Sequence, residues 1–218
     1  MRSRVPRCLP LVLVLIAVVV TMTACDSKPT AAESADTSAQ GARSATEPTA
    51  TASDEGSKTV PTANVKTNKG TFTITFFPEK APKHVEAFLK LSKEGFYDGN
   101  KVHRYEPNFV VQMGDPQTNS MTREDVIAKK NPRLGTGGPG YNLPAEFNDE
   151  PHVPGTVAMA RSQDPNSAGS QFYIVVGPAS FLDGNYTVFG KVTEGYDEVA
   201  SKLRVGDEIE SITVLNGQ

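Results

Sequence analysis

Alternation of apolar and polar residues predicts a chain built mainly from short β-strands. Residues 102–115 hold two apolar runs on either side of a Glu-Pro-Asn turn, which predicts a β-hairpin or a bent strand pair. An earlier hairpin is predicted from 64–67 and 71–77, which flank Asn-Lys-Gly at 68–70. Later strands are expected at about 155–160, 171–176, 187–192 and 208–214.

Two segments have the pattern of helices. Residues 81–94 form an amphipathic pattern closed by a glycine at 95, with apolar positions at Val85, Phe88, Leu89 and Leu91. A shorter helix is expected at about 197–203. Many short strands with two helices predict a mostly β fold, a closed antiparallel β-barrel capped by the helices.

The first 24 residues have the shape of a secretory signal. Arg2, Arg4 and Arg7 make a basic start, an unbroken aliphatic run follows at 11–20, and small residues close the segment. The run is too short to predict a membrane span. Met-Thr-Ala-Cys at 22–25 resembles a bacterial lipobox, in which the cysteine, here Cys25, becomes lipidated and begins the mature chain. The alternative is an ordinary cleaved signal followed by a stray cysteine.

A tether is expected between this signal and the folded part. From Cys25 to about residue 63 the chain is rich in Ala, Ser, Thr, Glu and Pro, with no aromatic residue and no strand or helix period. Such a segment buries too little apolar area to fold, so it is predicted to be disordered. As a flexible coil it would reach roughly 35 Å on average. It would hold a domain just clear of a membrane surface.

Residues 64–218 are expected to form one domain. These 155 residues contain no cysteine, so the domain depends on its core and not on disulfides. The formal net charge of the chain is −3, and it becomes −6 when the first 24 residues, with their three arginines, are removed. That mild acidity argues against nucleic acid as a partner, because phosphate binding requires a basic patch.

The sequence lacks the motifs of metal sites, serine nucleophiles and phosphate-binding loops. His84, His103 and His152 show no metal-ligand spacing, and the predicted domain has no cysteine to complete a site. No serine lies in a Gly-x-Ser-x-Gly elbow. Gly-Thr-Gly-Gly-Pro-Gly at 135–140 lacks the Lys-Ser/Thr ending of a phosphate loop, and is interpreted as a tight turn, with ligand binding as the lesser alternative. No metal, cofactor or covalent nucleophile is predicted.

The predicted hairpin carries a family resemblance. Val-His-Arg-Tyr-Glu-Pro-Asn-Phe-Val-Val-Gln-Met-Gly-Asp at 102–115 resembles the signature of the cyclophilin-type peptidyl-prolyl isomerases, in which Phe-His-Arg and a proline turn precede Phe-Met-x-Gln-Gly-Gly-Asp. Further matches follow in family order, at 135–138, 146–147, 154–160, 166–174 and 181–192. The resemblance covers residue 64 to the C-terminus. It implies an eight-stranded barrel with two helices and catalysis of X–Pro isomerisation without a covalent intermediate or a cofactor.

The resemblance also implies the site. Arg104 would be the catalytic donor, Gln112 would orient its guanidinium, and Phe109 would complete the catalytic set. The proline pocket would be formed by Val110, Tyr173 and Leu182, together with Phe109. The neighbouring groove would be lined by Ala160, Ser162, Gln171 and the backbone of Arg161. The far rim would be closed by Phe181 and Tyr186. For the single apolar residues, ordinary core packing is the alternative.

The chain departs from the best-known eukaryotic pattern in two ways. First, five site positions carry other residues: Met is replaced by Val110, Phe by Tyr173, Trp by Phe181, His by Tyr186 and Asn by Arg161. Phe181 cannot supply an indole N–H, so weak cyclosporin binding at most is expected.

The second departure is an insert. Nineteen residues at 116–134 stand where the family usually has a few, and 122–130 could form a short helix capped by a threonine. This insert is hypothesised to border the groove and tune peptide choice; a tolerated surface insertion is the alternative.

Together these features predict a prolyl isomerase, lipid-anchored on the extracytoplasmic face of the cell membrane, that assists protein folding. Its partners would be proline-containing polypeptides and, through the lipid, the membrane; a monomer is expected. One alternative is a non-catalytic binder of proline peptides that uses the same groove. Another is a structural envelope protein, which leaves the combination of Arg104, Phe109 and Gln112 unexplained.

Overall fold

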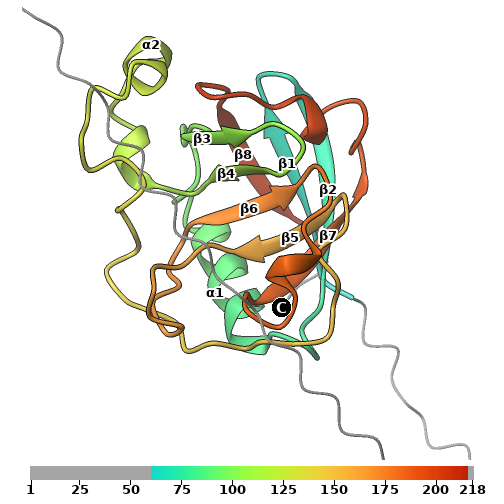
Figure 1. Ribbon diagram of the computed structural model, residues 1–218. Coiled ribbons are helices and arrows are strands. Elements are labelled where there is room, and N and C mark those ends of the chain that lie inside the picture. The colour runs from blue at the N-terminus through green and yellow to red at the C-terminus, as the bar shows by residue number, and fades with distance from the viewer. Residues whose placement is uncertain (1–59, 216–218) are drawn as a thin grey trace, which may run out of the picture. The chain divides into compact units, whose positions relative to one another are not determined.

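The segments with a period of two become one curled antiparallel sheet in the computed structural model, which describes residues 60–215 (Figure 1). The signal, Cys25 and most of the tether lie outside the described residues. The strands are β1 (Thr62–Thr67), β2 (Gly70–Phe76), β3 (Arg104–Glu106), β4 (Val110–Met113), β5 (Thr156–Met159), β6 (Phe172–Val175), β7 (Val188–Glu194) and β8 (Ile209–Val214). Their order in the sheet is β3-β4-β6-β5-β7-β2-β1-β8.

The sheet is open, so the prediction of a closed barrel is wrong. The two edge strands, β3 and β8, do not pair with each other. The chain just before β3 instead meets β8 near its start, through an isolated bridge between Lys101 and Glu208. Val102 donates from its backbone N–H to the Asp207 carbonyl at 2.8 Å, and β3 then follows β4 for only three residues. Because no ladder continues beyond the bridge, the result is a curled half-barrel.

The described residues contain two α-helices, the predicted amphipathic helix and the short threonine-capped helix predicted in the insert. The first, α1 (Pro82–Lys93), matches the predicted amphipathic segment. The second, α2 (Arg123–Ile127), lies within the insert and is capped by the Thr122 hydroxyl, which accepts from the Asp125 N–H at 3.2 Å. Short 3₁₀ turns occur at Pro116–Thr118, Ser180–Leu182 and Ala200–Lys202. No helix among the described residues is long and apolar enough to cross a membrane.

The helix expected at 197–203 is replaced by turns that end in a 3₁₀ turn. The backbone N–H of Ala200 bonds to the Gly195 carbonyl, five residues back, whereas that of Lys202 bonds to Val199, three residues back. The regular four-residue repeat of an α-helix is therefore absent from this segment. Val199 has φ −128° and ψ −66° and is buried, so packing into the core overrides the helical pattern.

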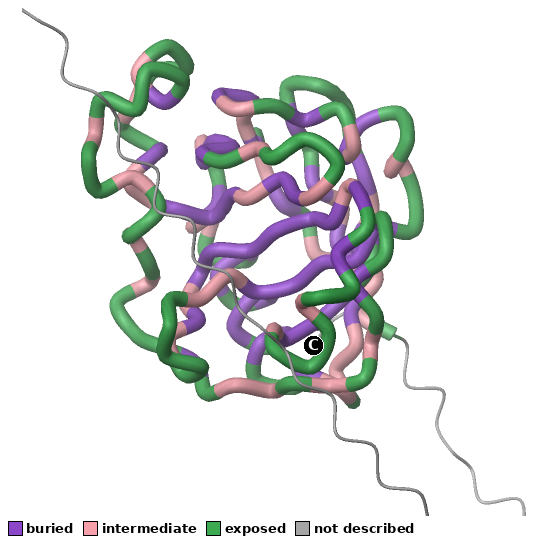
Figure 2. Tube along the Cα trace, viewed as in Figure 1, coloured by how far each residue is buried: buried purple, intermediate pink, exposed green. Residues whose placement is uncertain are grey.

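The main core fills the concave side of the sheet and includes one side of α1. Phe88 of α1 lies at its centre, with ring centroids 5.0–5.4 Å from four other rings. Those rings belong to Phe76, Tyr97, Phe172 and Phe189. Figure 2 shows the strands of the sheet as largely buried and the insert as largely exposed. A rigid apolar interior of this kind leaves the convex side of the sheet free to carry polar groups.

Candidate functional site

Strand register builds the site on the convex side of the sheet. Arg104 of β3 is paired with Gln112 of β4, Gln112 with Tyr173 of β6, and Tyr173 with Ala158 of β5. Paired positions in adjacent strands point to the same face and lie about 5 Å apart. A guanidinium, a carboxamide and a phenol therefore follow one another in a single row across three strands.

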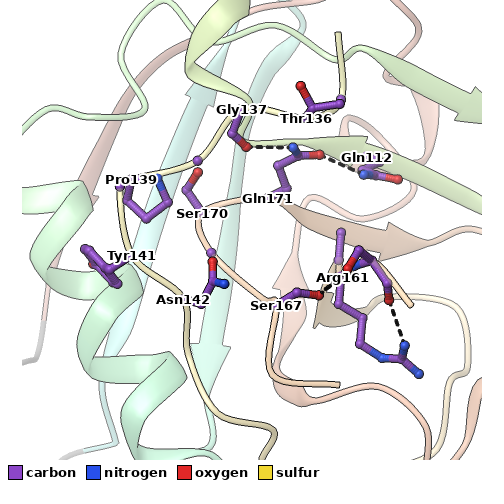
Figure 3. Close-up of a pocket in the computed structure, with 16 residues that line it drawn as sticks. Gln112, Thr136, Gly137, Pro139, Tyr141, Asn142, Arg161, Ser167, Ser170 and Gln171 are labelled. Atoms are coloured by element: carbon purple, nitrogen blue, oxygen red, sulfur yellow. Dashed lines mark hydrogen bonds between the residues drawn. The ribbon is translucent and has the colours of Figure 1, made fainter. Parts of the chain in front are cut away.

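Hydrogen bonds link the polar members of this row. Arg104 donates from Nη1 to Gln112 Oε1 and from Nε to Glu106 Oε1, both at 3.4 Å. Gln112 Nε2 donates to Gln171 Oε1 at 3.0 Å, and Gln171 Nε2 donates to the Gly137 carbonyl at 2.8 Å (Figure 3). The Arg104 side chain is 48% exposed, and its Nη2 has no hydrogen bond within residues 60–215. That nitrogen can donate to a bound molecule.

Two glycines allow the chain to approach closely enough for this network. A Cβ at Gly114, which has φ +96°, would lie 2.4 Å from the Ser170 carbonyl oxygen, next to Gln171. At Gly137 a Cβ would lie 2.1 Å from Asp115 Oδ1. Both distances are impossible for a real Cβ, so only glycine fits. In the Gly-rich segment, Gly135 ends a turn and Gly135 and Gly140 have positive φ, but 136–138 are irregular backbone, so a single tight turn at 135–140 is not formed. The segment forms one wall of the groove described below, which is the lesser alternative of the prediction.

A second apolar cluster, separate from the main core, lies on the face of the sheet that carries Gln112, where the proline pocket is predicted. Its buried members on three strands are Val110, Ala158, Tyr173 and Val175. Partly buried side chains pack around this cluster: Phe77, Phe109, Ala160, Leu182 and Tyr186. Phe181 stacks on Phe109 with ring centroids 5.3 Å apart and remains 69% exposed. A proline ring is of the kind that such an apolar surface accepts.

The phenol of Tyr173, a member of this cluster, is held by a buried imidazole. His152 Nε2 lies 3.0 Å from the Tyr173 hydroxyl, and its Nδ1 lies 2.8 Å from Asp183 Oδ1. Burial raises the pKa of Tyr173, so the hydroxyl stays protonated. Hydrogen bonds from the His152 backbone N–H and side chain lower the pKa of Asp183. The sequence pattern assigned neither His152 nor Asp183 to the site, although a phenol in an apolar environment implies a buried partner for its hydroxyl.

A polar groove continues from Gln112 on the side away from Arg104. Its volume is about 630 Å³, and Figure 3 shows the segment with Pro139, Tyr141 and Asn142 on one side of it and Arg161 on the other. The lining includes the turn from Gly135 to Asn142 and the predicted groove residues Ala160, Arg161, Ser162 and Gln171. A polar groove beside an apolar cluster suits an extended peptide with one apolar ring.

The Arg161 guanidinium has a role that sequence analysis did not assign. It donates to the Asn185 carbonyl from Nε at 3.1 Å and from Nη2 at 2.9 Å, and from Nη1 to the Ser162 carbonyl at 2.8 Å. It also lies over the Tyr186 ring, 4.5 Å from the centroid. These contacts hold the groove wall against the loop that forms the far rim of the predicted proline pocket.

The residues predicted for the site thus lie around one continuous surface, and Cys25 lies outside the described part of the chain. Their roles in catalysis and binding stay predictions. Within residues 60–215 no group of three or more His, Cys, Asp or Glu side chains is placed to hold a metal ion.

Comparisons with known proteins point to one family. The family described as "Cyclophilin type peptidyl-prolyl cis-trans isomerase/CLD" matches residues 62–214. A Brucella abortus protein named "Probable peptidyl-prolyl cis-trans isomerase" is 46% identical over 156 residues, 71% of this chain and 77% of the relative. A Synechococcus elongatus peptidyl-prolyl cis-trans isomerase is 41% identical over 154 residues, 70% of this chain and 95% of the relative. The fold is similar to that of a Cryptosporidium parvum cyclophilin crystallised in the presence of the dipeptide Ala-Pro, with a TM-score of 0.59. The two sequences are 26% identical, and the match covers 72% of this chain and 99% of the Cryptosporidium chain.

Proposed function

The chain belongs to the cyclophilin-type peptidyl-prolyl cis-trans isomerases and is an enzyme of that class, and on this premise we propose that Arg104, Gln112 and Phe109 form its catalytic centre. The observation that carries the proposal is the register that pairs Arg104 with Gln112 beside the apolar cluster. Proline-containing polypeptides are the proposed substrates.

The reaction requires stabilisation of a twisted amide. The barrier to X–Pro rotation is the partial double bond of that amide, about 18–20 kcal/mol. In the twisted transition state conjugation is lost and the prolyl nitrogen regains its lone pair. A donor fixed close to that nitrogen stabilises the twisted form and neither planar form, which is the differential binding that catalysis requires.

Arg104 is suited to be that donor. Its planar guanidinium fork can bond to the prolyl nitrogen with one N–H group while another is held by Gln112. Gln112 is itself held by Gln171, so the carboxamide that orients the guanidinium is fixed from behind. With Phe109 at the pocket edge, the apolar cluster would hold the proline ring still while the preceding carbonyl rotates.

The groove residues would hold the rest of the peptide. The backbone of Arg161 would bond to the carbonyl of a substrate residue, with Ala160, Ser162 and Gln171 beside it. Val110, Tyr173 and Leu182 would contact the proline ring, and Phe181 and Tyr186 would close the rim. No proton has to move between these groups and the substrate.

An Arg104→Ala variant tests the centre. We expect kcat/KM in a proline-peptide assay with the full chain to fall roughly 10²- to 10³-fold, as when one fixed transition-state donor is removed. Proline-peptide binding, measured by calorimetry, should fall far less. Lys66→Ala, a change at an exposed ion pair on β1, is the control and should leave turnover unchanged. A variant without Arg104 that keeps more than about a tenth of the activity would show that Arg104 is not the donor. Full activity loss with binding kept also separates an isomerase from a non-catalytic binder.

We further propose that the enzyme acts outside the cytoplasm as a folding catalyst, attached to the membrane by a lipid on Cys25. The support is the signal-like segment at 1–24, the Met-Thr-Ala-Cys sequence at 22–25 and the Ala/Ser/Thr-rich tether. In cells fed a labelled fatty acid, the wild type should carry label and sediment with membranes. Cys25→Ser should lose both properties. An unlabelled wild type would exclude the lipid, and the isomerase proposal would stand.

A further inference from the structure

The insert at 116–134 is a fixed wall and not a loose surface loop. Asp115, at its start, accepts from the backbone N–H of Gln117 at 2.8 Å and from that of Gly135, at its end, at 2.6 Å. Between these ends, Arg123 pairs with the fully buried Asp207 at 2.8 Å, and Val126 of α2 is fully buried. Figure 1 shows the insert with α2 at the edge of the domain, at the end of the sheet where β3 lies. The insert can therefore present side chains in set positions.

A second cavity, of about 460 Å³, lies between this wall and the edge of the sheet. The sheet side is lined by His103, Arg104, Glu106 and Gln112, and the insert side by Lys129, Asn131, Pro132, Leu134 and the adjoining Gly135. Gln112 and Gly135 also line the polar groove, so the two spaces meet at the proposed catalytic pair. A peptide bound with its proline on the apolar cluster would have neighbouring side chains within reach of this cavity.

The insert side of the cavity carries an unpaired positive charge. Lys129 follows α2 with φ +49°, a left-handed conformation in which glycine or asparagine is usual. Within the described range Lys129 forms no ion pair, whereas its neighbour Lys130 binds Asp125 at 2.5 Å and does not line the cavity. The one lining acid, Glu106, is already paired with Arg104. The cavity therefore has a surplus of positive charge.

The histidine on the sheet side adds neither a charge nor an accessible donor. His103 is 6% exposed and both of its ring nitrogens are buried, so neither faces a molecule bound in the cavity. Burial lowers its pKa against the opposing effects of Asp115 and Gln171, so at neutral pH the ring is uncharged. Lys129 is therefore the lining cation that no acid of the cavity pairs with.

We propose that this cavity is a substrate subsite that binds an aspartate or glutamate side chain close to the isomerised proline, with Lys129 as its counter-charge. The proposal rests on the proposed function of the adjoining centre. It converts the insert into a determinant of sequence preference: peptides with an acidic residue near proline would be better substrates than neutral or basic ones.

The test is a peptide series assayed with the full chain. A neutral parent peptide receives a single Glu, Gln or Lys at each position from three before to three after the X–Pro bond. We expect Glu at one or more positions to raise kcat/KM about twofold to fivefold over Gln at low salt, and the gain to shrink as salt rises. Lys129→Gln should abolish this Glu-to-Gln ratio, and Lys129→Glu should favour Lys instead. Lys130→Gln is the matched control and should keep both the ratio and the parent turnover.

Two results would overturn the subsite: equal rates for Glu and Gln at every position in the wild type, or a Glu preference that survives Lys129→Gln and Lys129→Glu. Turnover of the neutral parent separates this failure from that of the catalytic proposal. A wild type that isomerises the parent without any charge preference loses only the subsite, while Arg104→Ala still tests the centre.

Discussion

The two faces of β4, β5 and β6 differ sharply although they belong to the same strands. On the concave face Val111, Ile174 and Val157 are paired with one another and are fully buried. One position along, on the convex face, Gln112, Tyr173 and Ala158 are paired in the same way and form the site. Because successive side chains point to opposite faces, a step of one residue separates core from chemistry. Stability and turnover should therefore respond to different substitutions in the same strands.

The largest effect is expected on the concave face. Phe172→Ala removes a fully buried ring that packs against Phe88 and Tyr97 at 5.2 and 5.7 Å, and should lower the free energy of unfolding by about 3–5 kcal/mol. Urea unfolding measures it. Arg104→Ala, on the other face, should stay within about 0.5 kcal/mol of the wild type in the same experiment. A large loss of stability in the Arg104 variant would break the comparison.

A smaller loss of stability is expected at Tyr173, a buried residue of the convex face, where effects on stability and on turnover could overlap. Tyr173→Phe removes the hydroxyl that bonds to His152 Nε2 and leaves a buried ring nitrogen unpaired. Unfolding free energy should fall by about 1–3 kcal/mol. Since the ring that would contact proline remains, kcat/KM should change less than about threefold. A loss of turnover much larger than the loss of stability would instead give the hydroxyl a direct part in catalysis.

A third prediction concerns the exposed rim. Phe181→Trp supplies an N–H donor at a side chain that is 69% exposed, so stability should not change. Cyclosporin inhibition should tighten about threefold to tenfold, the equivalent of one added hydrogen bond. Inhibition constants for the two proteins decide the matter. Nanomolar inhibition of the wild type would contradict the prediction, because Phe181 lacks the donor.

The smallest effect is expected in the pH dependence of stability. Burial lowers the pKa values of His84 and His103 in the folded protein below the ordinary 6.5. As pH falls below 6.5 the unfolded chain binds protons first, so unfolding free energy decreases, down through the folded pKa values. Urea midpoints at pH 7.5 and 5.5 should show this loss, and His103→Gln should reduce it. An identical loss in that variant would exclude a contribution from His103. Asp183 and Asp207, whose pKa values are lowered from 3.8, act only at more acidic pH.

Local sequence pattern was sufficient to predict the hairpin that carries the site. The turn between two apolar runs sets the register, and the register alone makes Arg104 and Gln112 neighbours. The first hairpin and α1 follow from the same kind of short-range signal. Whether the sheet closes could not be read in this way, because it depends on how far the segment before β3 runs along β8.

Contacts between distant segments could not be predicted from the hydrophobic pattern either. His152 reaches Tyr173 across 21 positions and Asp183 across 31, and Arg123 reaches Asp207 across 84. Periodicity reports which face a residue occupies and not which remote residue it meets. The prediction of a helix at 197–203 was wrong for a related reason. The apolar spacing there suits a helix, but the burial of Val199 in the core requires a non-helical backbone conformation.

Both ends of the insert meet at the carboxylate of Asp115, which joins the hairpin before the insert to the groove segment after it. A loop grafted between residues 115 and 135 would also have to keep the Arg123 pairing with buried Asp207 and the Thr118 hydroxyl that accepts from the Lys101 N–H. Between these fixed points the length and charge of the loop can be varied. Such grafts offer a route to isomerases with chosen client sequences.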